Sequence, residues 1–195
     1  MTYNPEIHRR RSIRLRHYDY SKAGFYFITL CVQNRESLFG EIIQNQMTSS
    51  ATGAMIEKEW LALPNRFPYV ELHEYIVMPN HFHAILSLQT IPRHVGASLV
   101  DALETQTSTN HGQPLMANNG QPQGIAPTKN SHQTIGNIIG AFKSITTNEY
   151  IRGIKTLNWQ NFENRLWQRN YWEHVIRNEQ SRNEIAQYII TNPQK

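Results

Sequence analysis

The sequence has 195 residues, of which 39% are hydrophobic, and this suits one domain with a sizeable core. A mean hydropathy of -0.57 and a polar, basic start argue against a membrane span or a secretory signal, so we expect a soluble, cytoplasmic protein. The single cysteine, Cys31, excludes a disulfide within the chain.

The net charge of +4 resides in residues 1–22, where six basic residues oppose two acidic ones, and the charges of the remaining chain balance. The arginines of this basic arm are Arg9, Arg10, Arg11, Arg14 and Arg16. Two interpretations stay open. The arm is a solvated tail, or it binds phosphate groups, because guanidinium groups match phosphate oxygens in shape and charge.

Residues 23–195 show the patterns of one α+β domain. Strands are predicted where aromatic and β-branched residues run together, over residues 24–32, 69–78, 81–88 and 166–176. Helices are predicted from apolar spacing and capping residues, over residues 52–63, 134–152 and 179–191, and a small hairpin over residues 38–47. This order predicts a ferredoxin-like sandwich, with an antiparallel sheet, helices on one face and a separate C-terminal helix.

A long insertion interrupts this pattern at about residues 89–133. It contains no Phe, Trp or Tyr and is rich in Gln, Asn, Thr, Gly and Pro. Such a segment buries too little surface to offset the entropy cost of ordering it, so we expect it to be flexible.

The strand at residues 81–88 begins with two histidines separated by one residue, His81 and His83. Successive strand side chains point to opposite faces, so the two imidazoles share one face, about 6–7 Å apart along the chain. They are either a chelating pair or two hydrogen-bonded structural histidines.

The last predicted helix offers a partner for this pair. Tyr188 and Asn192 are four residues apart and therefore share a face of that helix. A phenol can act as a nucleophile and an amide oxygen can ligate a metal, although for this helix taken alone Tyr188 would instead be expected to pack in the core with Ile185 and Ile189. Two imidazoles and one amide oxygen leave positions for substrate oxygens and favour Mg²⁺ or Mn²⁺ over structural Zn²⁺.

Three blocks of this sequence resemble one family. They are VMPNHFH at residues 77–83, LWQRNYWEHVIRN at residues 166–178 and YIITNP at residues 188–193. In this order they resemble the REP-associated tyrosine transposases, members of the single-tyrosine, histidine-hydrophobe-histidine (HUH) superfamily of insertion-sequence transposases. Residues 24–30 and 138–144 look similar to the same family, so the resemblance covers the chain from about residue 17, the insertion excepted.

The resemblance implies a metal-dependent endonuclease and strand transferase that acts on single-stranded DNA. Tyr188 would attack a backbone phosphate and form a 5′-phosphotyrosine link, while His81 and His83 would hold the metal. Asn192 stands where many insertion-sequence relatives have glutamine. The implied DNA is a palindromic repeat folded as a hairpin, and the protein would be a monomer or homodimer associated with a prokaryotic nucleoid.

From the resemblance we expect the basic arm to contact DNA, with Arg169 and His174 as weaker candidates for phosphate contacts. The chain departs from the family pattern in its long insertion and in its early end after Asn192. Two other functions stay open: a domesticated protein that binds hairpins without cutting them, and a metal-dependent hydrolase in which water attacks.

Overall fold

The computed structural model describes residues 14–15, 17–90 and 134–194. The arginines Arg9, Arg10, Arg11 and Arg16 lie outside the described residues, as does the expected insertion from residue 91 to residue 133. The predictions of an extended basic arm and of a flexible insertion therefore stay predictions.

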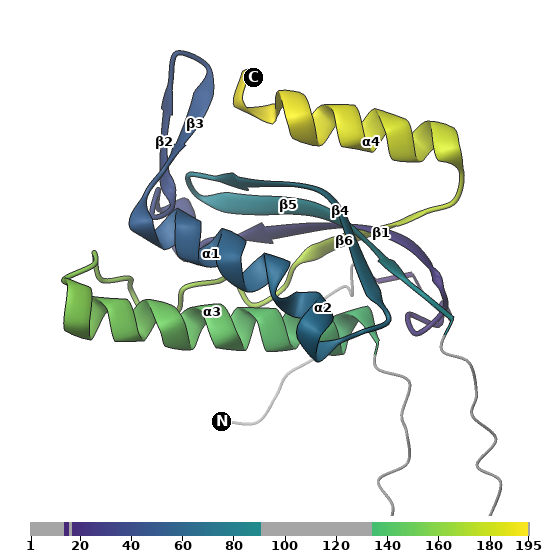
Figure 1. Ribbon diagram of the computed structural model, residues 1–195, viewed down its shortest axis with the longest axis horizontal. Helices are drawn as coiled ribbons and strands as arrows, with labels where there is room; N and C mark the ends of the chain where they lie inside the picture. The colour runs from purple at the N-terminus through teal and green to yellow at the C-terminus, as the bar shows by residue number, and fades with distance from the viewer. Residues whose placement is uncertain (1–13, 16, 91–133, 195) are drawn as a thin grey trace, which may run out of the picture. The chain divides into compact units, whose positions relative to one another are not determined.

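A four-stranded antiparallel sheet forms the centre of the described fold (Figure 1). Its strands are β1 (Gly24–Cys31), β4 (Val70–Met78), β5 (His81–Leu88) and β6 (Trp172–Ile176). They lie in the order β4-β5-β1-β6, with every neighbouring pair antiparallel. Together with the helices between them, this order is the ferredoxin-like arrangement that the sequence predicts.

The central strand β1 has apolar side chains on both faces because both faces are covered. On one face Tyr26, Ile28 and Leu30 of β1 join the main core. On the other face Phe25 and Phe27 pack against a smaller cluster. This double burial explains why β1 lacks the alternation of apolar and polar residues that marks a half-exposed strand.

Helices α1 (Ala51–Leu61) and α3 (Ile135–Leu157) cover one face of the sheet, and α4 (Glu179–Thr191) lies over the other (Figure 1). Each begins where its sequence provides a cap. The side chains of Ser50, Thr134 and Asn178 accept backbone N–H groups of the first turns, and Thr134 forms a capping box with Asn137. No helix among the described residues is long and apolar enough to cross a bilayer.

The predicted hairpin is present as β2 (Gly40–Ile43) and β3 (Gln46–Ser49). Its two-residue turn, Gln44 and Asn45, has positive φ at both positions, as a type I′ turn requires. In Figure 1 the hairpin stands beside the C-terminal end of α4, and β3 contacts the short 3-10 turn η2 (Asn192–Gln194) that follows this helix.

The boundaries of two helices, and of the last strand described below, differ from those predicted. Helix α1, predicted to reach residue 63, ends at Leu61. Pro64 lies in the first turn of a separate short helix, α2 (Leu63–Arg66), because proline fits that position. Helix α3 continues past residue 152 to Leu157, where Asn158 closes it in the left-handed conformation.

The last strand is much shorter than the predicted 166–176, because only residues 172–176 join the sheet as β6. The preceding segment is held both by the residues at the end of β1 and by α3. Trp167 forms an isolated bridge with Val32, and the Gln168 N–H donates to the Cys31 carbonyl at 2.9 Å. On α3, Lys143 Nζ donates to the carbonyl oxygens of Gln168 and Arg169, at 2.6 and 3.1 Å, and Trp167 Nε1 donates to Thr146 Oγ1 at 2.9 Å.

Candidate active site

The centre of the candidate site is a contact between the last helix and the histidine strand. The Tyr188 hydroxyl lies 3.4 Å from Nε2 of His83, and the two ring centroids are 5.4 Å apart. The Tyr188 side chain keeps 38% exposure, whereas His83 keeps only 5%. Tyr188 is therefore a partly exposed residue whose phenol oxygen lies against a buried imidazole.

Apolar packing of α4 on the sheet brings this phenol to the histidines. Ala186 and Ile189 are buried against Ile85 and Ile176. Because Tyr188 immediately precedes Ile189, this packing also sets the position of the phenol along the sheet. The described residues thus place the helix on the histidine face, as the sequence predicts.

Two aromatic residues of β1, Phe27 and Phe25, contact His83 and α4. Phe27 stacks on His83 with centroids 5.4 Å apart and meets Tyr188 edge-on at 6.3 Å. Nearer the start of α4, the Arg182 guanidinium lies over the Phe25 ring at 4.7 Å, a cation–π contact. Strand β1 therefore supports both ends of α4 through side chains on one face.

The hydrogen bonds of the two histidines define which nitrogens are available. Asn80 Nδ2 donates to the carbonyl of Arg35, so Asn80 Oδ1 is the atom that faces His81 Nδ1 at 2.7 Å. An amide oxygen only accepts, so Nδ1 of His81 carries the proton and Nε2 keeps its lone pair. Thr29 Oγ1 engages Nδ1 of His83 at 2.8 Å, which leaves Nε2 of that ring facing Tyr188.

Burial keeps both imidazoles neutral near pH 7. Burial lowers the pKa of His81, and the nearby positive charge of Arg35 lowers it further. Burial also lowers the pKa of His83 to about 4, with a smaller contribution from His81, whose ring centroid is 4.7 Å away. A neutral imidazole whose Nε2 keeps its lone pair is the form that ligates metals, and His81 has this form.

The depressed pKa of His83 predicts a loss of stability in acid. The unfolded histidine binds its proton near pH 6.5 and the folded one only near pH 4, so the unfolded state gains protons first as the pH falls. We expect the His83 contribution, about 3 kcal/mol of unfolding free energy, to be complete above pH 6.5 and lost as the pH falls to about 4.

Urea unfolding at several pH values in chelator would measure this loss. The matched control is His83→Gln, which lacks the titrating group. The difference in unfolding free energy between the two proteins should shrink from pH 7 to pH 4, and parallel curves would contradict the assignment.

Asn192, the predicted third ligand, begins η2 and is buried, with 9% exposure. Among the described residues, no hydrogen bond joins its amide to either histidine, and no group of three His, Cys, Asp or Glu side chains is placed to hold a metal. Two imidazoles leave the remaining positions of a metal ion to amide, water or phosphate oxygens, which are the ligands that Mg²⁺ and Mn²⁺ take.

The structure separates the DNA-contact candidates that it describes. His174 is exposed on β6, where it pairs with Phe27 across the ladder and therefore shares the face of Tyr188. Arg169 instead lines a hollow of about 410 Å³ between α3 and the loop before β6. Arg14 is anchored at β6, with its Nε 3.2 Å from Oε1 of Glu173.

Glu173 is a buried carboxylate that the sequence reasoning missed. It lies on β6 opposite Ile28, so it faces the main core, and its side chain is only 2% exposed. Arg14 also donates to the Tyr171 hydroxyl at 2.7 Å, and burial together with the Glu173 charge raises the pKa of Tyr171. An acidic residue at an inward position between aromatic and apolar neighbours was the available signal.

Removal of Arg14 should destabilise the fold, because it leaves the Glu173 charge buried without its partner. We expect Arg14→Ala to cost about 2 kcal/mol, less than the ~3–5 kcal/mol of a fully buried pair, because the Arg14 side chain is 45% exposed. Chemical denaturation measures the loss. Adding Glu173→Gln to Arg14→Ala should recover part of it, and a change within ~0.5 kcal/mol for Arg14→Ala would contradict the pairing.

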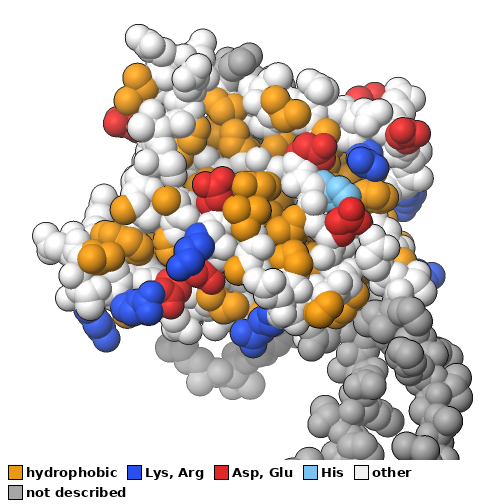
Figure 2. Space-filling model, in the orientation of Figure 1, with side chains coloured by type: hydrophobic (Ala, Val, Ile, Leu, Met, Phe, Trp, Pro, Cys, Tyr) orange, Lys and Arg blue, Asp and Glu red, His pale blue; other side chains and the backbone are white. Residues whose placement is uncertain are grey.

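The charged side chains on the face seen in Figure 2 do not mark a binding site for a polyanion. There, Lys and Arg side chains lie dispersed among Asp and Glu and form no continuous basic patch in the described part of the chain. Charge alone therefore does not locate an interface on that face.

The fold and these contacts define a ferredoxin-like α+β protein with a tyrosine–histidine cluster beneath its last helix. The chain belongs to the same family as an uncharacterized protein of Haemophilus influenzae, to which it is 39% identical over 191 residues, 98% of this chain and 92% of that protein. No established family model matches the sequence.

Two solved structures show a distant likeness. One is a REP-associated tyrosine transposase bound to a REP hairpin, with 20% identity and a TM-score of 0.47 over 93% of this chain and 72% of that one. The other is a protein from Deinococcus radiodurans provisionally called a transposase, with 17% identity and a TM-score of 0.40 over 92% of this chain and 96% of that one. Likenesses at these TM-scores carry no argument about function.

Proposed function

We propose that this protein is a metal-dependent endonuclease and strand transferase for single-stranded DNA that folds into hairpins. The observation that carries the proposal is the 3.4 Å approach of the Tyr188 hydroxyl to Nε2 of His83, next to His81. Two of the three sequence blocks that resemble the tyrosine transposases supply the two histidines and the tyrosine of this contact.

In the proposed reaction, the Tyr188 oxygen attacks a backbone phosphorus while the phenol loses its proton. The bond from phosphorus to the 3′ oxygen breaks, which yields a 5′-phosphotyrosine and a free 3′-hydroxyl. Attack of a 3′-hydroxyl on the phosphotyrosine reverses the step and joins strands. Because the phosphotyrosine bond can be attacked in this way, one tyrosine can both cut a DNA strand and join it again.

The histidines have a separate role in this proposal. His81 and His83, with Asn192, would hold Mg²⁺ or Mn²⁺, which polarises the scissile phosphate and stabilises its developing charge. Asn80 and Thr29 fix the imidazoles so that their Nε2 atoms remain available.

One chain is sufficient for the proposed site. Tyr188 reaches the His83 of its own chain, so the nucleophile and the histidines need no exchange of helices between protomers. A monomer can therefore carry the proposed chemistry.

The test is a covalent capture experiment with the full chain and a hairpin oligonucleotide that has single-stranded flanks. With Mn²⁺ or Mg²⁺, a label on the 3′ side of the cut should migrate with the protein under denaturing conditions, while a 5′ label should be released on a fragment ending in a 3′-hydroxyl. Chelator should abolish both products.

The other outcomes discriminate between the remaining functions. Cleavage without any covalent species would indicate a hydrolase in which water attacks. Tight binding without cleavage under either metal would indicate a hairpin-binding protein, and either result would overturn the proposal.

A further inference from the structure

The outer edge of the sheet carries an exposed aromatic residue close to the candidate site. Trp172 begins β6, an edge strand, and its side chain is 54% exposed, the largest aromatic surface among the exposed apolar residues of the described chain. It packs against no other aromatic ring of the described residues. A buried core role is therefore excluded for this side chain.

The sheet register places Trp172 on the face of the Tyr188 phenol. Trp172 pairs with Thr29, and Thr29 pairs with His83 on its other side. Directly opposed residues of an antiparallel sheet point to the same face, so Trp172 and His83 are two strands apart in one row. Strand spacing makes this roughly 10 Å between backbones, a distance that a short piece of single strand covers.

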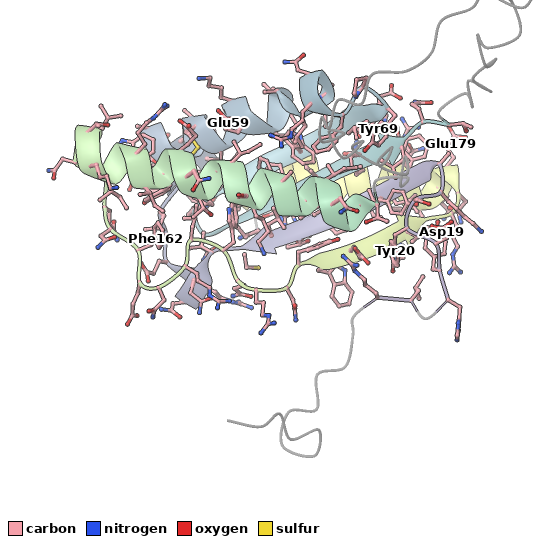
Figure 3. All side chains as sticks on the ribbon, turned by 90° about the horizontal axis from the view of Figure 1, so that it is seen from below. Asp19, Tyr20, Glu59, Tyr69, Phe162 and Glu179 are labelled. Carbon is pink, nitrogen blue, oxygen red and sulfur yellow. The ribbon has the colours of Figure 1, made fainter. Side chains whose placement is uncertain are left out.

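A hollow of about 450 Å³ continues from this row along the outer edge of β6. Its lining includes Trp172, His174 and Arg177, together with Tyr20 on the arm side and Asn178 at the start of α4. Figure 3 shows Tyr20 beside this edge of the sheet. The hollow thus lies between the root of the basic arm and the helix that carries Tyr188.

The charges of this hollow suit a polyanion. Arg177 contributes a positive charge, and His174 an exposed imidazole. The carboxylate in the lining, Glu173, is buried and paired with Arg14, so it presents little negative charge to a ligand. Among the described residues, β6 is also an edge strand with no strand partner on its outer side, and the outer side of an edge strand presents backbone N–H groups of the kind that bind phosphate oxygens.

We propose that Trp172, flanked by His174, is a stacking platform for an unpaired base of the single-stranded DNA next to the phosphate that Tyr188 attacks. The inference rests on the proposed function for its choice of ligand. An indole face stacks on any base, so the platform holds the strand across the row from β6 to His83 without reading its sequence. It makes Trp172 a positioning residue rather than a catalytic one.

Binding measurements test the platform without relying on cleavage. In a Tyr188→Phe background, which keeps the oligonucleotide intact, fluorescence anisotropy gives the affinity for a single-stranded probe. We expect Trp172→Ala to weaken binding roughly 5- to 100-fold and Trp172→Phe, which keeps a ring, to restore most of it. Leu157→Ala, at an exposed residue that ends α3, is the matched control and should bind as its parent does.

A set of probes that each lack one base can identify the base that stacks on Trp172. Removal of a single base should weaken binding to the Trp172 protein at one position of the probe, and the same removal should cost the Trp172→Ala protein nothing there. DNA binding should quench the tryptophan fluorescence of the protein that keeps Trp172, and this quenching should be lost in Trp172→Phe. Circular dichroism and thermal melts establish that each variant is folded.

Three results would overturn the platform: unchanged affinity of Trp172→Ala, equal sensitivity of both proteins at every abasic position, or a Trp172-dependent dimer in sedimentation with unchanged DNA binding. Failure of the proposed function looks different. In that case the protein with Tyr188 intact gives no covalent product, while the position-specific stacking signal of Trp172 persists.

Discussion

Tyr188→Phe should abolish covalent capture of DNA and reduce strand cleavage on the order of 10³-fold or more, because the phenol oxygen is the proposed nucleophile and phenylalanine offers none. The affinity for DNA should remain close to that of the parent, since the ring and its contact with Phe27 are retained. The side chain is 38% exposed, so the free energy of unfolding should change by no more than ~0.5 kcal/mol.

Tyr75→Phe is a suitable control for this substitution. Tyr75 also lies against the sheet, but it packs with the main core on the opposite face and donates its hydroxyl to Glu57 at 2.9 Å. Its loss should cost about 1 kcal/mol of stability and leave covalent capture intact. Equal adduct yields from the parent and Tyr188→Phe proteins would remove Tyr188 from the reaction and require another nucleophile.

Alternation along the chain was sufficient to predict the histidine strand. A period of two residues places His81 and His83 on one face and Phe82 and Ala84 on the other, and the described fold divides them between its two faces in this way. The same reasoning predicted the docking face of α4, because Tyr188 can approach the histidines only from that side.

The path of the chain before β6 could not be predicted from local pattern. The aromatic residues of segment 166–176 favour a strand throughout, yet Trp167 forms an isolated bridge with Val32 and donates its indole N–H to α3. These partners are distant in sequence, and a single sequence contains no signal that pairs them. Tertiary contacts therefore overrode the local preference for a strand.

The ion pair between Arg14 and Glu173 is a second feature that could not be predicted from the sequence. The sequence presents it as one of several arginines in a basic arm, all equally suited to phosphate. Its position beside the buried Glu173 is a contact between the arm and β6, which are far apart in the sequence. No local pattern pairs the two residues.

His83→Ala should lower the rate of covalent capture by roughly 10²- to 10³-fold, the range observed when one group that stabilises charge in a transition state is removed. His83 is expected to matter more than its neighbour, because its Nε2 both faces Tyr188 and belongs to the proposed metal site. Titration of Mn²⁺ against adduct yield measures both effects.

Thr29 provides a graded test of the same site, because its hydroxyl engages Nδ1 of His83, the nitrogen on the far side of the ring from the one that faces Tyr188. Thr29→Val keeps the shape and removes the hydroxyl, so metal affinity or capture rate should fall ~10- to 100-fold, while Thr29→Ser should restore it. His81→Ala should raise the metal requirement and leave the phenol contact in place. If His83→Ala and Thr29→Val both behaved as the parent protein does, the approach of Tyr188 to His83 would be packing alone, and the histidine row would have no part in the reaction.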